Sequence, residues 1–91
     1  MLHLVSYDIS DDRRRTKLAK VIKDFGDRVQ YSVFECLLDR DLLDRMTARI
    51  QAVIVEEEDS VRIYSLCVGC EKAITIIGQG EVTREEDVYI L

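Results

Sequence analysis

The sequence predicts an α+β fold in which two helices cover one face of a small antiparallel sheet. Short apolar stretches rich in β-branched residues alternate with two stretches whose apolar residues recur at helical spacing. The chain has 91 residues, 47% of them hydrophobic and 34% charged, which suits a single globular domain over residues 1–91. No apolar run could span a bilayer and the N-terminus does not resemble a signal peptide, so we expect a cytoplasmic protein without a membrane partner.

A strand and a helix are predicted first. Residues 2–9, LHLVSYDI, are β-branched and aromatic with apolar side chains on both faces, which is typical of a strand. Alternation places Asp8 on the face of Leu2 and Leu4, opposite Tyr7. Ser10 or Asp11 can cap the helix that follows. Its apolar face and its end at a glycine are defined by Leu18, Val21, Ile22, Phe25 and Gly26.

The remaining elements complete the expected order. RVQYSVFECLL, residues 28–38, predicts a longer strand region, and residues 39–58 predict a second helix. Further strands are expected at residues 60–67, 73–78 and 88–91. The order is β-α-β-β-α-β with one or two additional strands, including one at the C-terminus, and this is the split βαβ or ferredoxin-like pattern.

The second face of this sheet predicts an oligomer. Both helices of such a fold lie on one face, and the other is normally polar, whereas these strands are apolar on both sides. An uncovered apolar face of this size is unusual in a monomer. We therefore expect a homodimer through the second face, about a two-fold axis.

The charge of the chain is unevenly distributed. Residues 1–28 carry +2 and residues 29–91 carry −7, within a net charge of −5. Arg13, Lys17 and Lys20 would form a stripe opposite the apolar face of the first helix, which also fits an ordinary solvated helix surface. Arg14 and Arg15 lie in its first turn near Asp8 and would attract anions, so a nucleic-acid backbone is a candidate ligand.

Asp8 is a candidate ligand for a metal ion. If its face packs on a two-fold axis, two Asp8 carboxylates about 6 Å apart would repel by roughly 3 kcal/mol at an effective dielectric near 20. A divalent cation, Mg²⁺ or Mn²⁺, would turn this repulsion into a binding site and could activate water for phosphodiester cleavage. An acid at a strand end that is satisfied by backbone donors is the simpler alternative.

The cysteines do not suggest a disulfide framework. Their count is odd, at Cys36, Cys67 and Cys70, and no secretion signal accompanies them. CVGC has the spacing of a redox pair or half a zinc site, but there is no second CxxC and only one histidine. The motif is expected to close a strand rather than open a helix, so we predict reduced, structural thiols.

Two motifs carry a resemblance to a known family. YDISDDRRRTK and GDRVQYSVFE closely resemble the CRISPR-associated protein two family, the small subunit of the spacer-acquisition machinery. DSVRIYSLC fits a later strand of that family, although Ser65 stands where relatives often have proline. The resemblance covers nearly the whole chain and weakens after about residue 70. It implies a ferredoxin-like homodimer with Asp8 of each subunit at a shared Mg²⁺ site.

The resemblance also implies residue roles and partners. Family members are described as metal-dependent nucleases on single-stranded RNA or double-stranded DNA, and as bridges between integrase subunits during spacer insertion, where nuclease chemistry appears dispensable. The C-terminal strand typically adds to the partner subunit's sheet. Positions that match those associated with activity are Tyr7, Asp8, Arg15, Lys17, Arg28 and Phe34.

From residues and resemblance together, we expect one nuclease site with a basic surround. Asp8 and Tyr7 are predicted to be catalytic, with Asp8 as the metal ligand. Phe34 is predicted to support the site, although Tyr7 and Phe34 also fit ordinary core positions, and Arg28 could pair with Asp24 or Asp27. The predicted nucleic-acid contacts are Arg14, Arg15, Lys17 and Arg28.

Two alternatives stay open at this stage. The first is a non-catalytic adaptor that holds DNA through its basic surface without a metal. The second is a ferredoxin-like regulatory module that binds a small anion at the SDDRRR turn.

Overall fold

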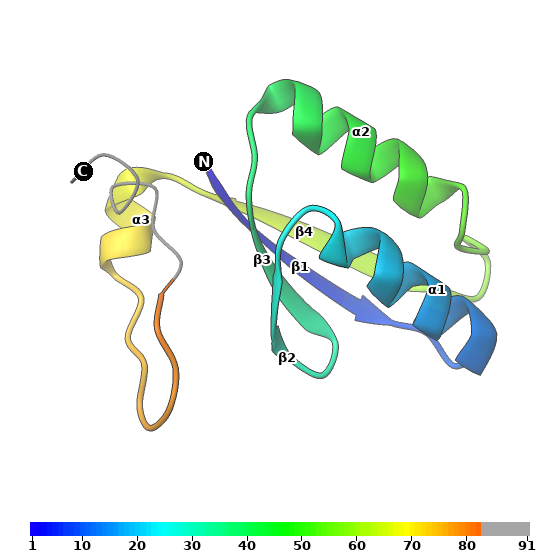
Figure 1. Cartoon of the computed structure of the whole chain (residues 1–91), viewed down its shortest axis with the longest axis horizontal. Helices are drawn as coiled ribbons and strands as arrows, with labels where there is room; N and C mark the ends of the chain where they lie inside the picture. The colour runs from blue at the N-terminus through cyan, green and yellow to red at the C-terminus, as the bar shows by residue number, and fades with distance from the viewer. Residues whose placement is uncertain (83–91) are drawn as a thin grey trace.

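The computed structural model describes residues 1–82 of the chain (Figure 1). Its elements are β1 (Leu2–Asp8), α1 (Asp12–Lys23), β2 (Asp27–Gln30), β3 (Val33–Leu37), α2 (Arg40–Gln51), β4 (Ser60–Leu66) and α3 (Val68–Lys72). The first six reproduce the β-α-β-β-α-β order, so the α+β, ferredoxin-like prediction is confirmed.

One four-stranded sheet organises the molecule, with the strand order β2-β3-β1-β4 and antiparallel pairing throughout. Strand β1 is central, because Val5 is paired with Phe34 of β3 on one side and with Ile63 of β4 on the other. Asp8, the last residue of β1, lies opposite Ser60, the first residue of β4. This register places the Asp8 carboxylate at one end of the sheet.

The helices α1 and α2 lie on the same face of the sheet, as predicted (Figure 1). Asp11 caps α1, since its carboxylate accepts a hydrogen bond from the Arg14 backbone N–H at 2.9 Å. Asp39 caps α2 in the same way through the Leu42 N–H. The buried cluster between helices and sheet consists of Val5, Tyr7, Ile9, Leu18, Val21, Ile22, Phe34, Cys36, Leu38, Met46 and Ile50.

Residues 28–38 fold as a hairpin instead of one long strand. Strands β2 and β3 are joined by a turn at Tyr31 and Ser32, with a register shift between Arg28 and Gln30. The Ser32 carbonyl accepts a hydrogen bond from the Tyr7 N–H, so the turn is held by the central strand. This turn was not predicted from the sequence, because the segment 28–38 contains no glycine, proline or asparagine.

The second helix is shorter than predicted, since α2 ends at Gln51 and residues 52–58 form turns. Val53 and Ile54 nevertheless pack against the core, which explains why their spacing extended the helical pattern. The Asp59 carboxylate accepts a hydrogen bond from the Val55 N–H at 2.8 Å, and the Asp59 N–H bonds back to the Val55 carbonyl. These hydrogen bonds stabilise a non-helical turn here, so the helix does not continue.

The region after β4 differs most from the prediction. CVGC opens the short helix α3, with Cys67 as its N-cap, and does not simply close a strand. Residues 73–78 form no strand in the part of the chain that is described, and Ile77 is 95% exposed. Their β-branched side chains favour a strand, but the chain turns away from the sheet at α3 (Figure 1). These residues therefore do not lie beside a strand with which they could pair. The strand predicted at residues 88–91 lies outside the described residues.

The open face of the sheet carries more polar side chains than predicted. Polar side chains occupy it at Ser6, Asp8 and Arg62, beside the partly buried Leu4 and a Tyr64 that is 46% exposed. This face is therefore mixed rather than uniformly apolar. Within residues 1–82 no helix is long and apolar enough to cross a membrane.

Candidate functional site

Asp8 lies at the end of β1 on the open face, where its side chain is exposed. It lines a shallow hollow of about 270 Å³ with Ser6, Tyr7, Ser60, Arg62 and Tyr64. Among residues 1–82 the Asp8 carboxylate makes no hydrogen bond or ion pair with another side chain. The simpler sequence alternative was an acid satisfied by backbone donors, and the described residues show no such hydrogen bond to Asp8.

The donor set around Asp8 is sparse for a metal ion. No group of three or more His, Cys, Asp or Glu side chains comes together anywhere in the described chain. Asp8 offers carboxylate oxygens and Ser6 and Ser60 offer hydroxyls, which are the hard oxygen ligands that Mg²⁺ accepts. The chemistry of these donors thus suits Mg²⁺, but they are few among the described residues, so a Mg²⁺ site here would need a second carboxylate.

Tyr7 lies on the opposite face from Asp8, because consecutive strand residues point to opposite sides of a sheet. Its ring is only 5% exposed and stacks on Phe34 with a centroid distance of 6.3 Å. The Tyr7 hydroxyl donates to the Tyr31 carbonyl oxygen at 3.4 Å. Tyr7 therefore lines the hollow of Asp8, but its ring packs with Phe34 in the core on the other side of the sheet.

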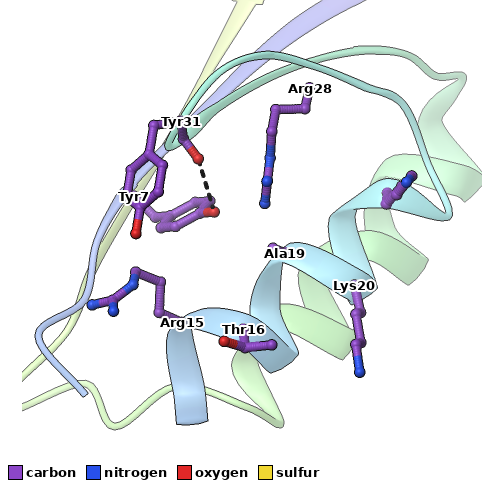
Figure 2. Close-up of a pocket in the computed structure, with 8 residues that line it drawn as sticks. Tyr7, Arg15, Thr16, Ala19, Lys20, Arg28 and Tyr31 are labelled. Atoms are coloured by element: carbon purple, nitrogen blue, oxygen red, sulfur yellow. Dashed lines mark hydrogen bonds between the residues drawn. The ribbon is translucent and has the colours of Figure 1, made fainter. Parts of the chain in front are cut away.

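A basic pocket of about 410 Å³ lies between α1 and the β2–β3 hairpin (Figure 2). Tyr7 and Tyr31 form one side, and α1 contributes the other side through Arg15 and the residues after it (Figure 2). Four of its lining residues are cations and none is an acid, namely Arg15, Lys20, Lys23 and Arg28. Aromatic rings beside converging cations suit a ligand with a phosphate and a flat face.

Two of the cations in this pocket are held by specific contacts. Arg15 donates to the Ile9 carbonyl oxygen at 2.9 Å and pairs with Asp12, and these bonds fix its guanidinium at the pocket mouth. Its pKa is raised, chiefly by the hydrogen bond to Asp12. The Arg28 guanidinium lies over the Phe34 ring, 5.2 Å from its centroid. Arg28 thus stacks on the core and is not engaged by Asp24 or Asp27.

Arg14 faces away from this pocket and is compensated by acids. Its guanidinium donates to both carboxylate oxygens of Asp59, at 2.8 and 3.1 Å, and to Glu58 at 3.1 Å. The Asp59 side chain is fully buried, and the hydrogen bond from Arg14 lowers its pKa. A fork-to-carboxylate pair of this kind is a structural tie between α1 and the turn before β4. It leaves Arg14 poorly suited to hold a phosphate.

Lys17 is exposed on α1 and lines a second shallow hollow with Arg13 and Lys20. It makes no ion pair within the part of the chain described here, so its charge is available to an anion. The predicted nucleic-acid residues therefore divide into a pocket group, Arg15 and Arg28, a neighbouring helix residue, Lys17, and a structural residue, Arg14.

Several residues near these sites were not singled out from the sequence. Arg62 and Tyr64 share the open face with Asp8, and a hydrogen bond from Arg62 to Tyr64 raises the Arg62 pKa. Alternation along residues 60–67 would have placed both on that face once the register was known. Asp59, the partner of Arg14, is 45 residues away along the chain and carries no local signal.

The fold and these two surfaces define a small ferredoxin-like protein with an exposed carboxylate on its open sheet face and a basic pocket on its helical face. Residues 1–74 match the sequence model of the family described as CRISPR associated protein Cas2. The chain therefore belongs to the CRISPR-associated Cas2 family.

Two relatives match essentially the full chain. A protein of Chloroflexus aurantiacus named CRISPR-associated endoribonuclease Cas2 1 is 43% identical over 93 residues, covering 100% of both chains. A protein of Thermus thermophilus named CRISPR-associated endonuclease Cas2 2 is 40% identical over 90 residues, covering 99% of this chain and 96% of its own. The two names attach nuclease activity to both relatives.

Solved structures show the same fold. The crystal structure of Streptococcus pyogenes Cas2 at pH 6.5 superposes with a TM-score of 0.75 at 32% identity, covering 86% of this chain and 100% of its own. A chain in the structure titled partial Cas6-RT-Cas1--Cas2 complex gives a TM-score of 0.73 at 30% identity, covering 85% of each. A chain with this fold is thus found in a complex with Cas1.

Proposed function

We propose that this protein acts in CRISPR adaptation as a homodimer that holds a nucleic-acid backbone, bridges the Cas1-type integrase subunits and cleaves phosphodiesters with Mg²⁺, or Mn²⁺ in its place. One observation carries the catalytic part, namely the exposed Asp8 carboxylate, which has no partner among residues 1–82, on the open sheet face of a Cas2-family chain. The names of the relatives support nuclease chemistry, and the Cas1-containing neighbour supports the partner.

The open face is the proposed dimer interface. It exposes Tyr64 and carries the partly buried Leu4, Val33, Leu37 and Leu66 among polar residues, which is the composition of an interface rather than of a solvated surface. Two copies related by a two-fold axis would bring the two Asp8 side chains toward each other. The second copy would supply the carboxylate that a single chain lacks.

Asp8 would hold the cation together with the Asp8 of the second copy, and the Ser6 and Ser60 hydroxyls would orient its water ligands. When bound, Mg²⁺ would supply an activated water and neutralise charge on the phosphodiester. Arg62, in the same hollow, would attract the phosphate toward Asp8. Since Tyr7 lies on the other face, we assign it to positioning Phe34 and Arg28 and not to the chemistry.

A non-catalytic DNA adaptor is a second candidate, and a specific observation favours it. The basic pocket with Arg15, Lys20 and Arg28 lies on the helical face, whereas the exposed Asp8 side chain is on the open face. A nucleic-acid backbone could be held by these cations without any contact to a metal ion. The small-anion module is less favoured, because Arg14 of the SDDRRR turn is engaged by the buried Asp59 carboxylate.

The test compares the wild type with Asp8→Asn, which removes the charge and keeps the shape of the side chain. Cleavage of labelled single-stranded RNA and duplex DNA is measured in Mg²⁺, Mn²⁺ and EDTA, with the mass in solution determined for both proteins. We expect metal-dependent cleavage that falls by about 100- to 1000-fold in Asp8→Asn, the usual effect of removing one charge-stabilising group. Ser60→Ala serves as a control in the same hollow and should lose far less.

The outcomes separate the two candidates. Equal cleavage by the wild type and Asp8→Asn, or none by either, together with metal-independent binding of duplex DNA, would establish the adaptor instead. A monomeric mass across dilution would refute the shared Asp8 site.

A further inference from the structure

The two cysteines of CVGC form a close and accessible pair. Cys67 and Cys70 are both exposed, and their Sγ atoms lie 3.3 Å apart across the first turn of α3. The Cys70 backbone N–H donates a hydrogen bond to the Cys67 Sγ at 3.4 Å. Only a small closure of this distance is needed to form a disulfide, because the two side chains already point toward each other.

The two thiols are electronically unequal. The hydrogen bond from the Cys70 N–H, followed by that from the Cys70 thiol, lowers the pKa of Cys67. The same contact with Cys67 raises the pKa of Cys70. In thiol–disulfide exchange the thiolate is the attacking group, and a partner that stays protonated can act second. This asymmetry gives Cys67 the attacking role and Cys70 the resolving role.

The third cysteine provides a contrast within the same chain. Cys36 is fully buried in the core, and burial raises its pKa to about 11. A protonated and inaccessible thiol is inert toward small reagents. The protein therefore carries one structural cysteine, as the sequence predicted for all three, and a separate exposed pair that packing does not explain.

We propose that Cys67 and Cys70 form a reversible dithiol–disulfide site that reacts with low-molecular-weight disulfides such as oxidised glutathione. The Cys67 thiolate attacks one sulfur of the small disulfide, forming a mixed disulfide and releasing one thiol. The Cys70 sulfur then attacks the Cys67 sulfur, gives up its proton to solvent and displaces the second thiol. Two electrons pass from the cysteine pair to the small disulfide, which leaves as two thiols.

The location of this site makes it independent of the proposed cleavage chemistry. Leu66, directly before Cys67, is paired with Leu2, whereas Asp8 is paired with Ser60 at the far end of the same two strands. Oxidation would cross-link the residue that caps α3 to the first turn of that helix and leave the Asp8 hollow intact. The site therefore goes beyond the nuclease and adaptor functions, and its test needs no cleavage assay.

The test uses the full chain in buffers of graded reduced-to-oxidised glutathione ratio, quenched by alkylation and read by peptide mass spectrometry. We expect a disulfide between Cys67 and Cys70 to appear and to disappear reversibly with the ratio, while Cys36 stays reduced. At neutral pH, Cys67 of the reduced protein should be alkylated at least ~10-fold faster than Cys36. Circular dichroism confirms that the protein stays folded throughout.

Two matched variants test the assigned roles. Cys70→Ser should accumulate a mixed disulfide of glutathione on Cys67, because the resolving thiol is gone, and Cys67→Ser should accumulate far less on Cys70. The proposal is refuted if no disulfide between Cys67 and Cys70 forms in the folded protein at any ratio. Equal trapping by the two variants would likewise refute the assignment of Cys67 as the attacking thiol.

Discussion

The two faces of the sheet differ in how much of their environment one chain supplies. On the helical face Phe34 is fully buried, stacked with Tyr7 and covered by Arg28. On the open face Asp8 and Tyr64 are exposed, and the Asp8 carboxylate has no partner within residues 1–82. The comparison teaches that the core is complete in the monomer, whereas the proposed chemistry on the open face needs a second molecule.

The largest expected effect comes from deleting the core aromatic. Phe34→Ala should lower the free energy of unfolding by about 3–5 kcal/mol, because it leaves a cavity between helices and sheet. Tyr64→Ala on the open face should cost little in dilute protein, yet its cost should rise with concentration if that face joins two copies. Chemical denaturation at several protein concentrations measures both. If the destabilisation by Tyr64→Ala does not change with protein concentration, the open face does not join two copies.

A close approach on the helical face gives the next effect. A Cβ on Gly26 would lie 2.3 Å from the Glu35 carbonyl oxygen and 2.5 Å from the Cys36 Sγ, so the α1–β2 turn would have to move. Gly26→Ala should therefore destabilise by about 1–3 kcal/mol. Gly69→Ala is the matched control, because its Cβ would meet only the Cys67 Sγ at 3.9 Å. A similar loss in both variants would contradict this explanation.

The basic pocket predicts a binding effect that needs no metal. Lys20→Ala should weaken duplex DNA binding and reduce the slope of log affinity against log salt concentration by about one, the effect of losing one phosphate contact. Arg45→Ala, which removes an exposed charge from α2 outside the pocket, is the control. Binding is followed by fluorescence anisotropy in EDTA. An unchanged slope for Lys20→Ala would remove the pocket from the proposed interface.

The smallest effect concerns acid stability. The hydrogen bond from Arg14 lowers the Asp59 pKa below its ordinary value of 3.8, so the carboxylate stabilises the fold above about pH 4. This contribution is lost as the pH falls through the range below 4. Asp59→Asn should therefore have a lower melting temperature at pH 7 and a shallower decline below pH 4. Asp44→Asn, from an exposed pair with Arg40, should retain the wild-type profile.

Much of the fold could be predicted because it follows from local periodicity. The spacing of Leu18, Val21 and Ile22 defines α1, and alternation along β1 is enough to separate Asp8 from Tyr7. The β2–β3 turn was not predicted, since Ser32 is the one turn-favouring residue in the segment 28–38 and the turn is held by a hydrogen bond from the central strand. The same limit explains the missed end of α2, which depends on Asp59.

The candidate site was less accessible from sequence because its contacts are long-range. Arg14 looked like a phosphate ligand from its place in the basic block, and only its fork with Asp59 reveals a structural role. Tyr7 was predicted to be catalytic from the family resemblance, although a strand sends the side chains of Tyr7 and Asp8 in opposite directions. The CVGC pair was assigned to the interior by analogy with buried thiols, which only Cys36 turns out to be.

Successive side chains of β1 point to opposite faces, so this strand should tolerate substitutions better than deletions. A substitution at Ser6 or Asp8 changes one side chain on one surface, and the other surface keeps its packing. Deleting a single codon between Leu4 and Tyr7 would instead exchange the surfaces, turning the carboxylate toward the helices and the aromatic ring toward solvent. Natural variation in this strand should therefore arise by replacement and almost never by changes in length.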